Sequence, residues 1–202
     1  MTIPRQPADA QASDIPGLLV SASRGDESAW REILARYGKR VFAMARSRCG
    51  RPELAEEITQ SVFATIATKL VEPDGGYTEQ GRFESWLFRV TMNRVRDYAR
   101  RERRHAEATD PAVFGSVEAR PVDADDDDAG LEVTRLRGAM TGLNDMDREV
   151  IELRHHGGMS FKQMAELLEE PIGTLLARHH RALRKLKELM TGAERTTQRS
   201  RP

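Results

Sequence analysis

Residues 159–190 read MSFKQMAELLEEPIGTLLARHHRALRKLKELM, and this stretch decides the fold of the C-terminal part of the chain. Ser160 and Gln163 are spaced as in a capping box, which predicts a helix of about nine residues after Ser160. A short turn that contains Gly173 leads into a second helix, which begins near Thr174 and continues to the end of the stretch. Two helices joined by a tight turn, the second one basic, are typical of a helix-turn-helix.

The second of these helices is amphipathic. Its predicted inner face carries Leu175, His179, Ala182, Leu183 and Leu186. Its other faces are rich in arginine, lysine and histidine. An α-helix fits the major groove of DNA, where arginine and lysine contact guanine edges and phosphates. A basic helical face is also typical of an ordinary solvated surface, so charge and turn geometry alone leave both interpretations open.

Apolar residues also recur at helical spacing ahead of the quoted stretch. They predict two short helices, with Leu136, Met140 and Leu143 in the first and Val150, Ile151 and Leu153 in the second. Together with the helix-turn-helix, these helices predict a small domain over residues 132–190.

A larger helical domain is predicted over residues 24–104. Its first segment begins at Asp26, a suitable helix cap, and is interrupted at Gly38. A second helix begins at Pro52 and carries an apolar residue at every fourth position: Leu54, Ile58, Val62, Ile66 and Leu70. A third helix begins at Phe83 with aromatic residues and ends in a run of arginines. We expect the apolar end to pack and the basic end to project.

The charge is unevenly distributed, although 32 basic residues balance 32 acidic ones over the whole chain. Residues 24–104 contain 17 basic and 12 acidic residues, whereas residues 105–134 contain one basic and nine acidic residues. The acidic stretch has no helical or strand periodicity, so residues 105–131 are predicted to form a flexible acidic linker. The termini, residues 1–23 and 191–202, carry no motif and are predicted to be disordered. The sequence thus predicts an all-α protein of two small helical domains joined by this linker.

Several classes of protein are excluded by what the sequence lacks. The single cysteine, Cys49, excludes an internal disulfide framework and argues against a cysteine metal site. The longest uncharged, apolar-leaning run, residues 61–68, is far shorter than the roughly 18 residues of a membrane span. The N-terminus lacks the apolar region of a signal peptide. We therefore expect a cytoplasmic protein without membrane insertion.

An enzyme is not indicated either. Histidine pairs at 155–156 and 179–180 invite a metal site, but neighbouring residues on a helix face apart. No HExxH or paired-cysteine motif completes a ligand set, and no glycine-rich phosphate loop of the Walker type occurs. We expect no metal, no cofactor and no catalytic residues.

Both domains resemble regions of bacterial RNA polymerase sigma factors. The first domain is similar to region 2 in LAEEITQSVF at 54–63, FESWLFRVTMN at 83–93 and DYARR at 97–101. The second domain is similar to region 4 in LNDMDREVIELR at 143–154, MSFKQMAELL at 159–168, PIGT at 171–174 and RAL at 181–183. Regions 2 and 4 joined by a linker are the layout of the extracytoplasmic-function (ECF) subgroup. The resemblance implies a sigma factor that binds core RNA polymerase, directs it to specific promoters and promotes DNA opening.

The resemblance also implies roles for individual residues. Docking on the clamp helices of the polymerase β′ subunit would use Glu56, Glu57, Gln60 and Phe63. Recognition of the minus-10 promoter element would use Arg89, Asn93, Arg96, Arg100 and Arg101, with Trp86 assigned to packing. Recognition of the minus-35 element would use Ser160, Lys162, Thr174, Arg178, His180, Arg181 and Arg184. The implied partners are core RNA polymerase, through its β′ clamp helices and β flap, promoter DNA and an anti-sigma protein.

Three positions of the second helix depart from the family's pattern. Leu176 and Ala177 stand where a basic residue and a serine are common, and His179 stands where an aliphatic core residue is common. We expect an altered minus-35 preference or a weaker reliance on that element. We expect His179 to be a half-buried histidine and not a metal ligand.

Two other classes stay open on the residues alone. A helix-turn-helix regulator that is not a polymerase subunit would share the second domain but would not need the first. An interaction adaptor would use its helices for protein contacts alone and would show no salt-dependent DNA binding.

Overall fold

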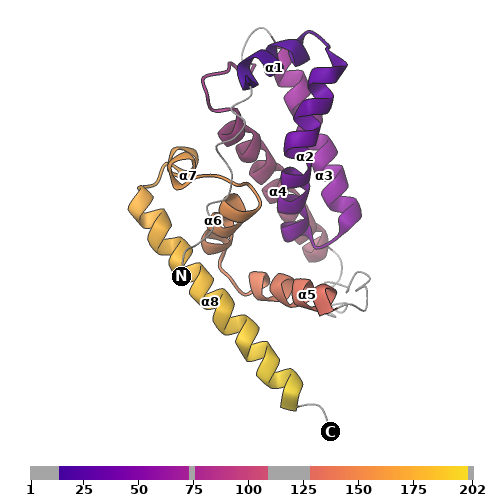
Figure 1. Cartoon of the computed structure of the whole chain (residues 1–202). Coiled ribbons are helices and arrows are strands. Elements are labelled where there is room, and N and C mark those ends of the chain that lie inside the picture. Colours follow the sequence, from indigo (N-terminus) through magenta and orange to yellow (C-terminus); the bar gives the residue numbers. More distant parts are fainter. Residues whose placement is uncertain (1–13, 73–75, 109–127, 200–202) are drawn as a thin grey trace.

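The computed structural model describes residues 14–72, 76–108 and 128–199, and the regular secondary structure in these ranges is helical (Figure 1). Eight α-helices lie within them, which confirms the all-α prediction. The middle of the expected linker, residues 109–127, lies outside the described residues, as do the two ends of the chain. Within the described ranges, no helix combines the length and the hydrophobicity of a membrane span.

The first domain contains four helices: α1 (Ile15–Ser23), α2 (Glu27–Cys49), α3 (Pro52–Val71) and α4 (Phe83–Ala108). α2, α3 and α4 pack on one another, and α1 contacts α2 and α3 at one end of this bundle (Figure 1). Asp26 caps α2 as predicted, because its carboxylate accepts hydrogen bonds from the backbone N–H groups of Ser28 and Ala29.

α2 continues through Gly38, so the predicted interruption at this glycine is wrong. A glycine inside a helix costs about 1 kcal/mol relative to alanine. Ile33, Tyr37, Val41 and Met44 on both sides of it are buried on one face of the helix. Their burial outweighs the local cost, since each large apolar side chain contributes about 1.5–3 kcal/mol.

The N-terminal segment is ordered further upstream than predicted. The expectation of disorder over residues 1–23 is wrong for α1, in which Leu19 and Ala22 are 3% and 1% exposed. The indole N–H of Trp30 donates to the carbonyl oxygen of Ala22 at 3.0 Å and holds the end of α1 on α2. A helix this short is marginal by itself, so packing on the bundle stabilises it.

The second domain contains α5 (Asp128–Thr141), α6 (Asp145–His155), α7 (Phe161–Leu168) and α8 (Ile172–Arg199). The predicted capping box is confirmed. Ser160 Oγ accepts from the Gln163 backbone N–H at 3.2 Å, and Gln163 Oε1 accepts from the Ser160 backbone N–H at 2.8 Å. Glu169 ends α7 in the left-handed conformation (φ 56°), and α8 begins close to the predicted Thr174. α7 and α8 thus form the helix-turn-helix.

Several helices extend beyond the predicted boundaries. α8 continues to Arg199, so the expectation of disorder over residues 191–202 is wrong for most of that segment. α4 ends at Ala108 and α5 begins at Asp128, so both enter the expected linker. Alanine, glutamate and arginine are strong helix formers, and a helix that packing already anchors continues through them.

The inner face of α8 is narrower than predicted. Leu175, Ala182 and Leu186 are buried, whereas Leu183 is 40% exposed. The buried residues are seven and four positions apart, which keeps them in one line along the helix. Leu183 lies eight positions after Leu175 and is therefore rotated away from that line, so its assignment to the inner face is wrong.

The two domains pack against each other. One continuous apolar core joins them, because side chains of the second domain lie within the core of the first: Val150, Leu153, Met159, Met164, Leu167 and Leu175. α7 contacts α4, and α6 contacts α2 (Figure 1). A separate apolar cluster holds α5, α6 and α8 together within the second domain. A long linker permits separation of the domains but does not impose it, and burial of these side chains favours contact.

Leu19→Ala tests whether α1 is part of the core. Because Leu19 is 3% exposed, its truncation should lower the free energy of unfolding by about 2–5 kcal/mol. Val20, the next residue, is 48% exposed, so Val20→Ala should change it by no more than about 0.5 kcal/mol. Urea denaturation followed by circular dichroism measures both. Equal effects of the two substitutions would contradict the packing of α1.

Candidate nucleic-acid interface

α8 presents a basic face opposite the face that it buries. The buried side carries Leu175, Ala182 and Leu186. The predicted DNA-contacting residues that are exposed on α8 are Thr174, His180, Arg181 and Arg184. Leu176 and Ala177 are exposed among them. Donors on an exposed helical face can hold phosphates and reach base edges in a groove.

Arg178 has a different environment from the other predicted contacts of α8. It is partly buried, and its two terminal nitrogens lie 2.9 and 2.8 Å from the two carboxylate oxygens of Glu170. Such a bidentate pair fixes the geometry of both side chains. In this structure Arg178 therefore fastens the start of α8 to the turn that precedes it.

The N-terminal end of α7 lies exposed beside α8. Ser160 and Lys162 are both exposed there. The unpaired backbone N–H groups and the dipole of a helix N-terminus favour a negative charge nearby. Lys162 adds a cation to the same end, which suits the predicted contact with a backbone phosphate.

α4 carries the second predicted surface. The exposed residues are Arg89, Asn93, Arg96, Arg100 and Arg101. The first four are spaced by four, three and four residues and therefore share one face of the helix. Arg100 forms a 3.0 Å ion pair with Asp97 of the same helix. A track of arginines suits a nucleic-acid backbone, and the Asn93 amide has both a donor and an acceptor for a base edge.

The aromatic residues of α4 mainly serve packing. Phe83 and Phe88 are 2% and 0% exposed. Trp86 stacks on Tyr77 with ring centroids 4.2 Å apart and lies against the core, which confirms its assignment to packing. Fully buried rings offer no face to an unpaired base. The exposed surface of α4 is therefore polar and cationic.

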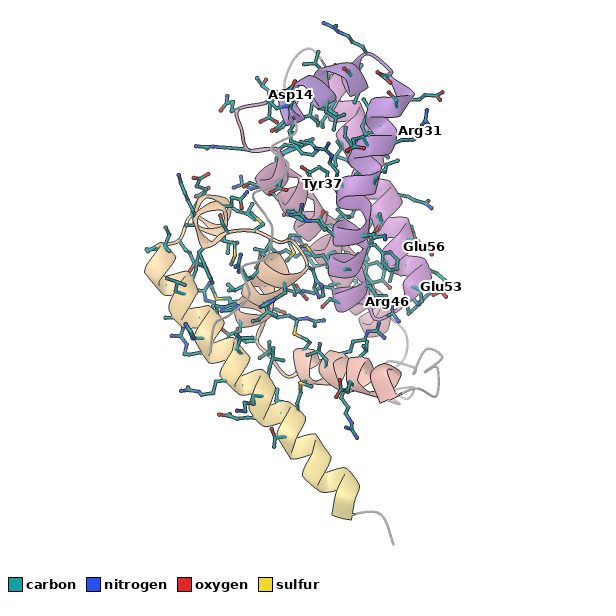
Figure 2. All side chains as sticks on the ribbon, in the orientation of Figure 1. Asp14, Arg31, Tyr37, Arg46, Glu53 and Glu56 are labelled. Atoms are coloured by element: carbon teal, nitrogen blue, oxygen red, sulfur yellow. The ribbon has the colours of Figure 1, made fainter. Side chains whose placement is uncertain are left out.

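α3 presents the residues predicted to meet the polymerase. Glu56, Glu57 and Gln60 are exposed, and Figure 2 shows Glu56 on the outer side of α3. Phe63, the fourth predicted residue, is 8% exposed and belongs to the core. The surface that α3 offers to a partner is thus acidic and polar, and Phe63 packs in the core beneath this surface.

The two domains also share an ionic cluster that the sequence analysis missed. Glu152 of α6 is 0% exposed. Its carboxylate accepts from Arg48 Nε at 2.6 Å, from Ser47 Oγ at 2.9 Å and from Arg148 Nε at 3.0 Å. Arg48 and Ser47 belong to α2 of the first domain. The signal in the sequence is weak: a glutamate between two apolar residues of α6.

His155 and His179 form a second contact that the sequence analysis missed. Their Nε2 atoms are 3.1 Å apart, and their ring centroids are 5.3 Å apart. The distance between the centroids is close to the Nε2–Nε2 distance plus the radii of the two rings. The two Nε2 atoms therefore point at each other, as in an N–H···N hydrogen bond. One ring must be neutral to accept that bond. Burial lowers the pKa of both rings.

The histidine contact does not form a metal centre. Metal ligands aim their lone pairs at a common point, whereas these two nitrogens aim at each other. Among the residues that the structure describes, no group of three or more histidine, cysteine or acidic side chains could hold a metal ion. His179 is partly buried, as expected.

The fold and these surfaces define a two-domain helical protein suited to bind nucleic acid through a helix-turn-helix and an arginine-lined helix. Residues 33–105 match the family model of Sigma-70 region 2, and residues 139–188 match that of Sigma-70 region 4. The chain is 30% identical to the RNA polymerase sigma factor CarQ of Myxococcus xanthus over 169 residues, 82% of this chain and 91% of that protein. The chain belongs to the RNA polymerase sigma factors.

Two further relatives are ECF sigma factors. The chain is 27% identical to BldN of Streptomyces coelicolor over 187 residues, which cover 92% of this chain and 69% of that protein. It is 27% identical to SigE of Mycolicibacterium smegmatis over 188 residues, which cover 89% of this chain and 70% of that protein. The protein is an ECF sigma factor that directs transcription initiation, and this family is not one of enzymes.

Two solved structures have a similar fold. CnrH, in complex with the cytosolic domain of CnrY, has a TM-score of 0.62 at 26% identity and covers 87% of this chain and 96% of that one. The sigma factor RpoE of Bartonella quintana, in complex with the anti-sigma factor NepR, has a TM-score of 0.60 at 23% identity, with 80% and 96% covered. At 23% identity, the similarity to RpoE shows only a shared fold.

The histidine contact predicts a pH-dependent stability of the second domain. Burial lowers the pKa of His155 and His179 below the ordinary 6.5, and the cation of Arg154 adds to this. A histidine whose pKa falls on folding stabilises the protein above its unfolded pKa, and this contribution is lost as the pH falls. The melting temperature should therefore decrease between about pH 7 and pH 5.

His179→Leu should reduce this decrease, because it removes one of the two rings and restores an aliphatic residue. His180→Gln, at the exposed neighbouring position, is the control and should retain most of the pH dependence. Thermal unfolding by circular dichroism at a series of pH values measures the pH dependence of the melting temperature. An unchanged pH profile in His179→Leu would show that the contact does not titrate.

Proposed function

We propose that α8 reads the minus-35 promoter element and that α4 opens and reads the minus-10 element. The observation that carries this proposal is the placement of the exposed cations. Those of α8 lie opposite its buried face, and those of α4 share one face with Asn93. Cations position a helix on the phosphates, and groups such as an amide distinguish bases.

On α8, Arg181 and Arg184 contact the groove and its phosphates, and Thr174 and His180 lie at the same face. Ser160 and Lys162 hold the backbone from the start of α7. Arg178 acts differently from the sequence-based expectation, because it positions the turn through Glu170. Its removal would then disturb α8 without removing a direct contact.

The exposed Leu176 and Ala177 modify the minus-35 contact. Apolar side chains can touch a thymine methyl group but form no hydrogen bonds to base edges. The exposed surface of α8 therefore offers fewer polar contacts than is common in the family. This supports a weaker reliance on the minus-35 element and a preference for an element with suitably placed thymines.

On α4, the captured strand is held by cations and not by buried rings. Arg89, Arg96, Arg100 and Arg101 bind the backbone, and Asn93 reads an exposed base. Stacking on an aromatic ring contributes about 1–3 kcal/mol per base elsewhere, but Phe83 and Phe88 are too deeply buried to supply it. Electrostatic capture by the arginines therefore contributes to the free energy of opening.

The polymerase contacts follow the same reasoning. Glu56, Glu57 and Gln60 dock on the clamp helices of the β′ subunit, with Phe63 supporting the surface from the core. The second domain contacts the β flap. We also propose an anti-sigma protein as a partner, because the structurally similar CnrH was solved with the cytosolic domain of CnrY.

Arg181→Ala should lower promoter-specific transcription by about tenfold or more and leave the affinity for core polymerase unchanged, because it removes only groove contacts. Arg31→Ala, an exposed arginine on α2 far from α8, is the matched control (Figure 2). In vitro transcription with core enzyme over a random promoter library measures activity and identifies both elements. An equal loss of core binding in Arg181→Ala would refute the assignment.

The double substitution Glu57→Ala and Gln60→Ala should weaken the binding of core polymerase. It removes two polar contacts to the polymerase, so the dissociation constant for core enzyme should rise about tenfold. Direct binding of labelled sigma factor to core polymerase measures this. Glu27→Ala removes an exposed carboxylate of α2 instead and should leave the constant unchanged. If both variants bound core enzyme like the wild type, α3 would not be the docking surface.

A further inference from the structure

One buried cation of the first domain has no partner. Arg46, near the C-terminal end of α2, is 9% exposed. Among the described side chains, its Nη1 is the one buried nitrogen or oxygen atom without a hydrogen bond. The buried carboxylate of Glu152, by contrast, has three partners. A buried charge without a partner costs free energy, and such groups concentrate at functional sites.

The helix that follows α2 begins without a side-chain cap. α3 begins at Pro52, and the side chain of the preceding Arg51 forms no capping hydrogen bond with its first turn. A helix N-terminus leaves backbone N–H groups unpaired and carries a partial positive charge. Glu53 is the acidic residue of this first turn, and its side chain is exposed to solvent. The start of α3 therefore favours an anion.

The unpaired guanidinium lies beside this uncapped turn. Figure 2 shows Arg46 and Glu53 at the same end of the first domain, and the charge of Glu53 acts on the pKa of Arg46 by raising it. The two side chains nevertheless form no ion pair or hydrogen bond with each other. Arg46 and the first turn of α3 thus form one positively charged corner.

A second cation approaches this corner from the other domain. Burial lowers the pKa of Arg46, and the positive charge of Arg137 on α5 lowers it further. Figure 1 shows α5 across the ends of α2 and α3. Two guanidinium groups that act on each other repel, and an anion between them reverses the sign of this interaction. Arg137 is exposed, so an anion can reach it from solvent.

We propose that Arg46, Arg137 and the first turn of α3 form a binding site for a phosphate group. A guanidinium presents two parallel donors that match two phosphate oxygens, and the start of a helix suits the other oxygens. A planar carboxylate carries one charge and satisfies one such fork, whereas a tetrahedral phosphate presents oxygens in several directions. A phosphate bound here joins α2 of the first domain to α5 of the second.

The phosphate group can belong to a nucleic acid or to a small molecule. Arg51, which precedes α3, lines a cleft of about 600 Å³ together with Arg100 of α4. Because Arg100 is a proposed minus-10 contact, a DNA backbone that follows α4 reaches the start of α3 through this cleft. A free phosphate or a phosphate monoester offers the same oxygens. The nucleic-acid source rests on the proposed function, whereas the site itself does not.

Inorganic phosphate tests the site in the full chain. The melting temperature, measured by circular dichroism at equal ionic strength, should be about 3 °C or more higher in saturating phosphate than in chloride. Arg46→Met keeps the apolar length of the side chain and should abolish this shift. In chloride it should melt no lower than the wild type, because it removes an unpaired buried charge. Arg31→Met, an exposed position of α2, is the matched control and should keep the shift (Figure 2).

Two further variants keep the test decisive if Arg46→Met does not fold. Arg137→Gln changes an exposed residue and should reduce the shift in phosphate. Glu53→Gln removes a nearby negative charge and should lower the phosphate concentration that gives half of the shift. An equal shift in wild type, Arg46→Met and Arg137→Gln would overturn the proposal. So would an equal loss of melting temperature in Arg46→Met and Glu53→Gln in chloride, because these two side chains would then be partners of each other.

A second measurement separates the two sources of phosphate. Polymerase that carries the sigma factor is bound to a promoter from the random library, with single phosphates upstream of the minus-10 element replaced by uncharged methylphosphonates. If the source is DNA, one replacement should weaken binding about tenfold with the wild type and not with Arg46→Met. If no replacement depends on Arg46 but the phosphate shift is present, the site binds a small phosphate compound. Loss of all promoter binding with the shift intact would contradict the proposed function and leave the site.

Discussion

The carboxylate of Glu152 is buried between the two domains and neutralised by the guanidinium groups of Arg48 and Arg148. A carboxylate without partners at this depth would be strongly destabilising, so the position of α6 on α2 is set by these cations and by the Ser47 hydroxyl. α7 follows α6 after a short turn and therefore lies against α4 (Figure 1). The contact of α7 with α4 and the outward position of α8 both depend on where α6 is held.

The two surfaces that we assign to DNA are consequently in different states. Arg181 and Arg184 on α8 face outward, whereas Arg89 and Arg96 on α4 already have partners in the second domain. The exposed acidic residues of α3 lie on a third surface that the domain contact leaves uncovered. A partner on α3 therefore does not compete with the domain contact for the same side chains.

The features that could be predicted from the sequence are those set by residues a few positions apart. The capping box depends on Ser160 and Gln163 alone. Together with the turn that contains Gly173, it predicts the helix-turn-helix. α1 could not be predicted, because its stability comes from Leu19 packing on a bundle that the local sequence does not describe. The contact between Arg48 and Glu152 joins positions 104 residues apart, and His155 meets His179 across 24. No periodicity links such pairs, so only the folded chain brings them together.

Two of the guanidinium groups that we assign to DNA contact groups of the second domain. Arg96 pairs with Glu149 and Arg89 donates to the Leu167 carbonyl oxygen, so in the proposed function each of them exchanges this partner for a phosphate. Salt weakens phosphate binding and the exposed pair alike, and the buried Glu152 contact is screened far less. Changes in ionic strength therefore weaken the exposed Arg96 pair more than the buried Glu152 contact, which continues to hold α6 on α2.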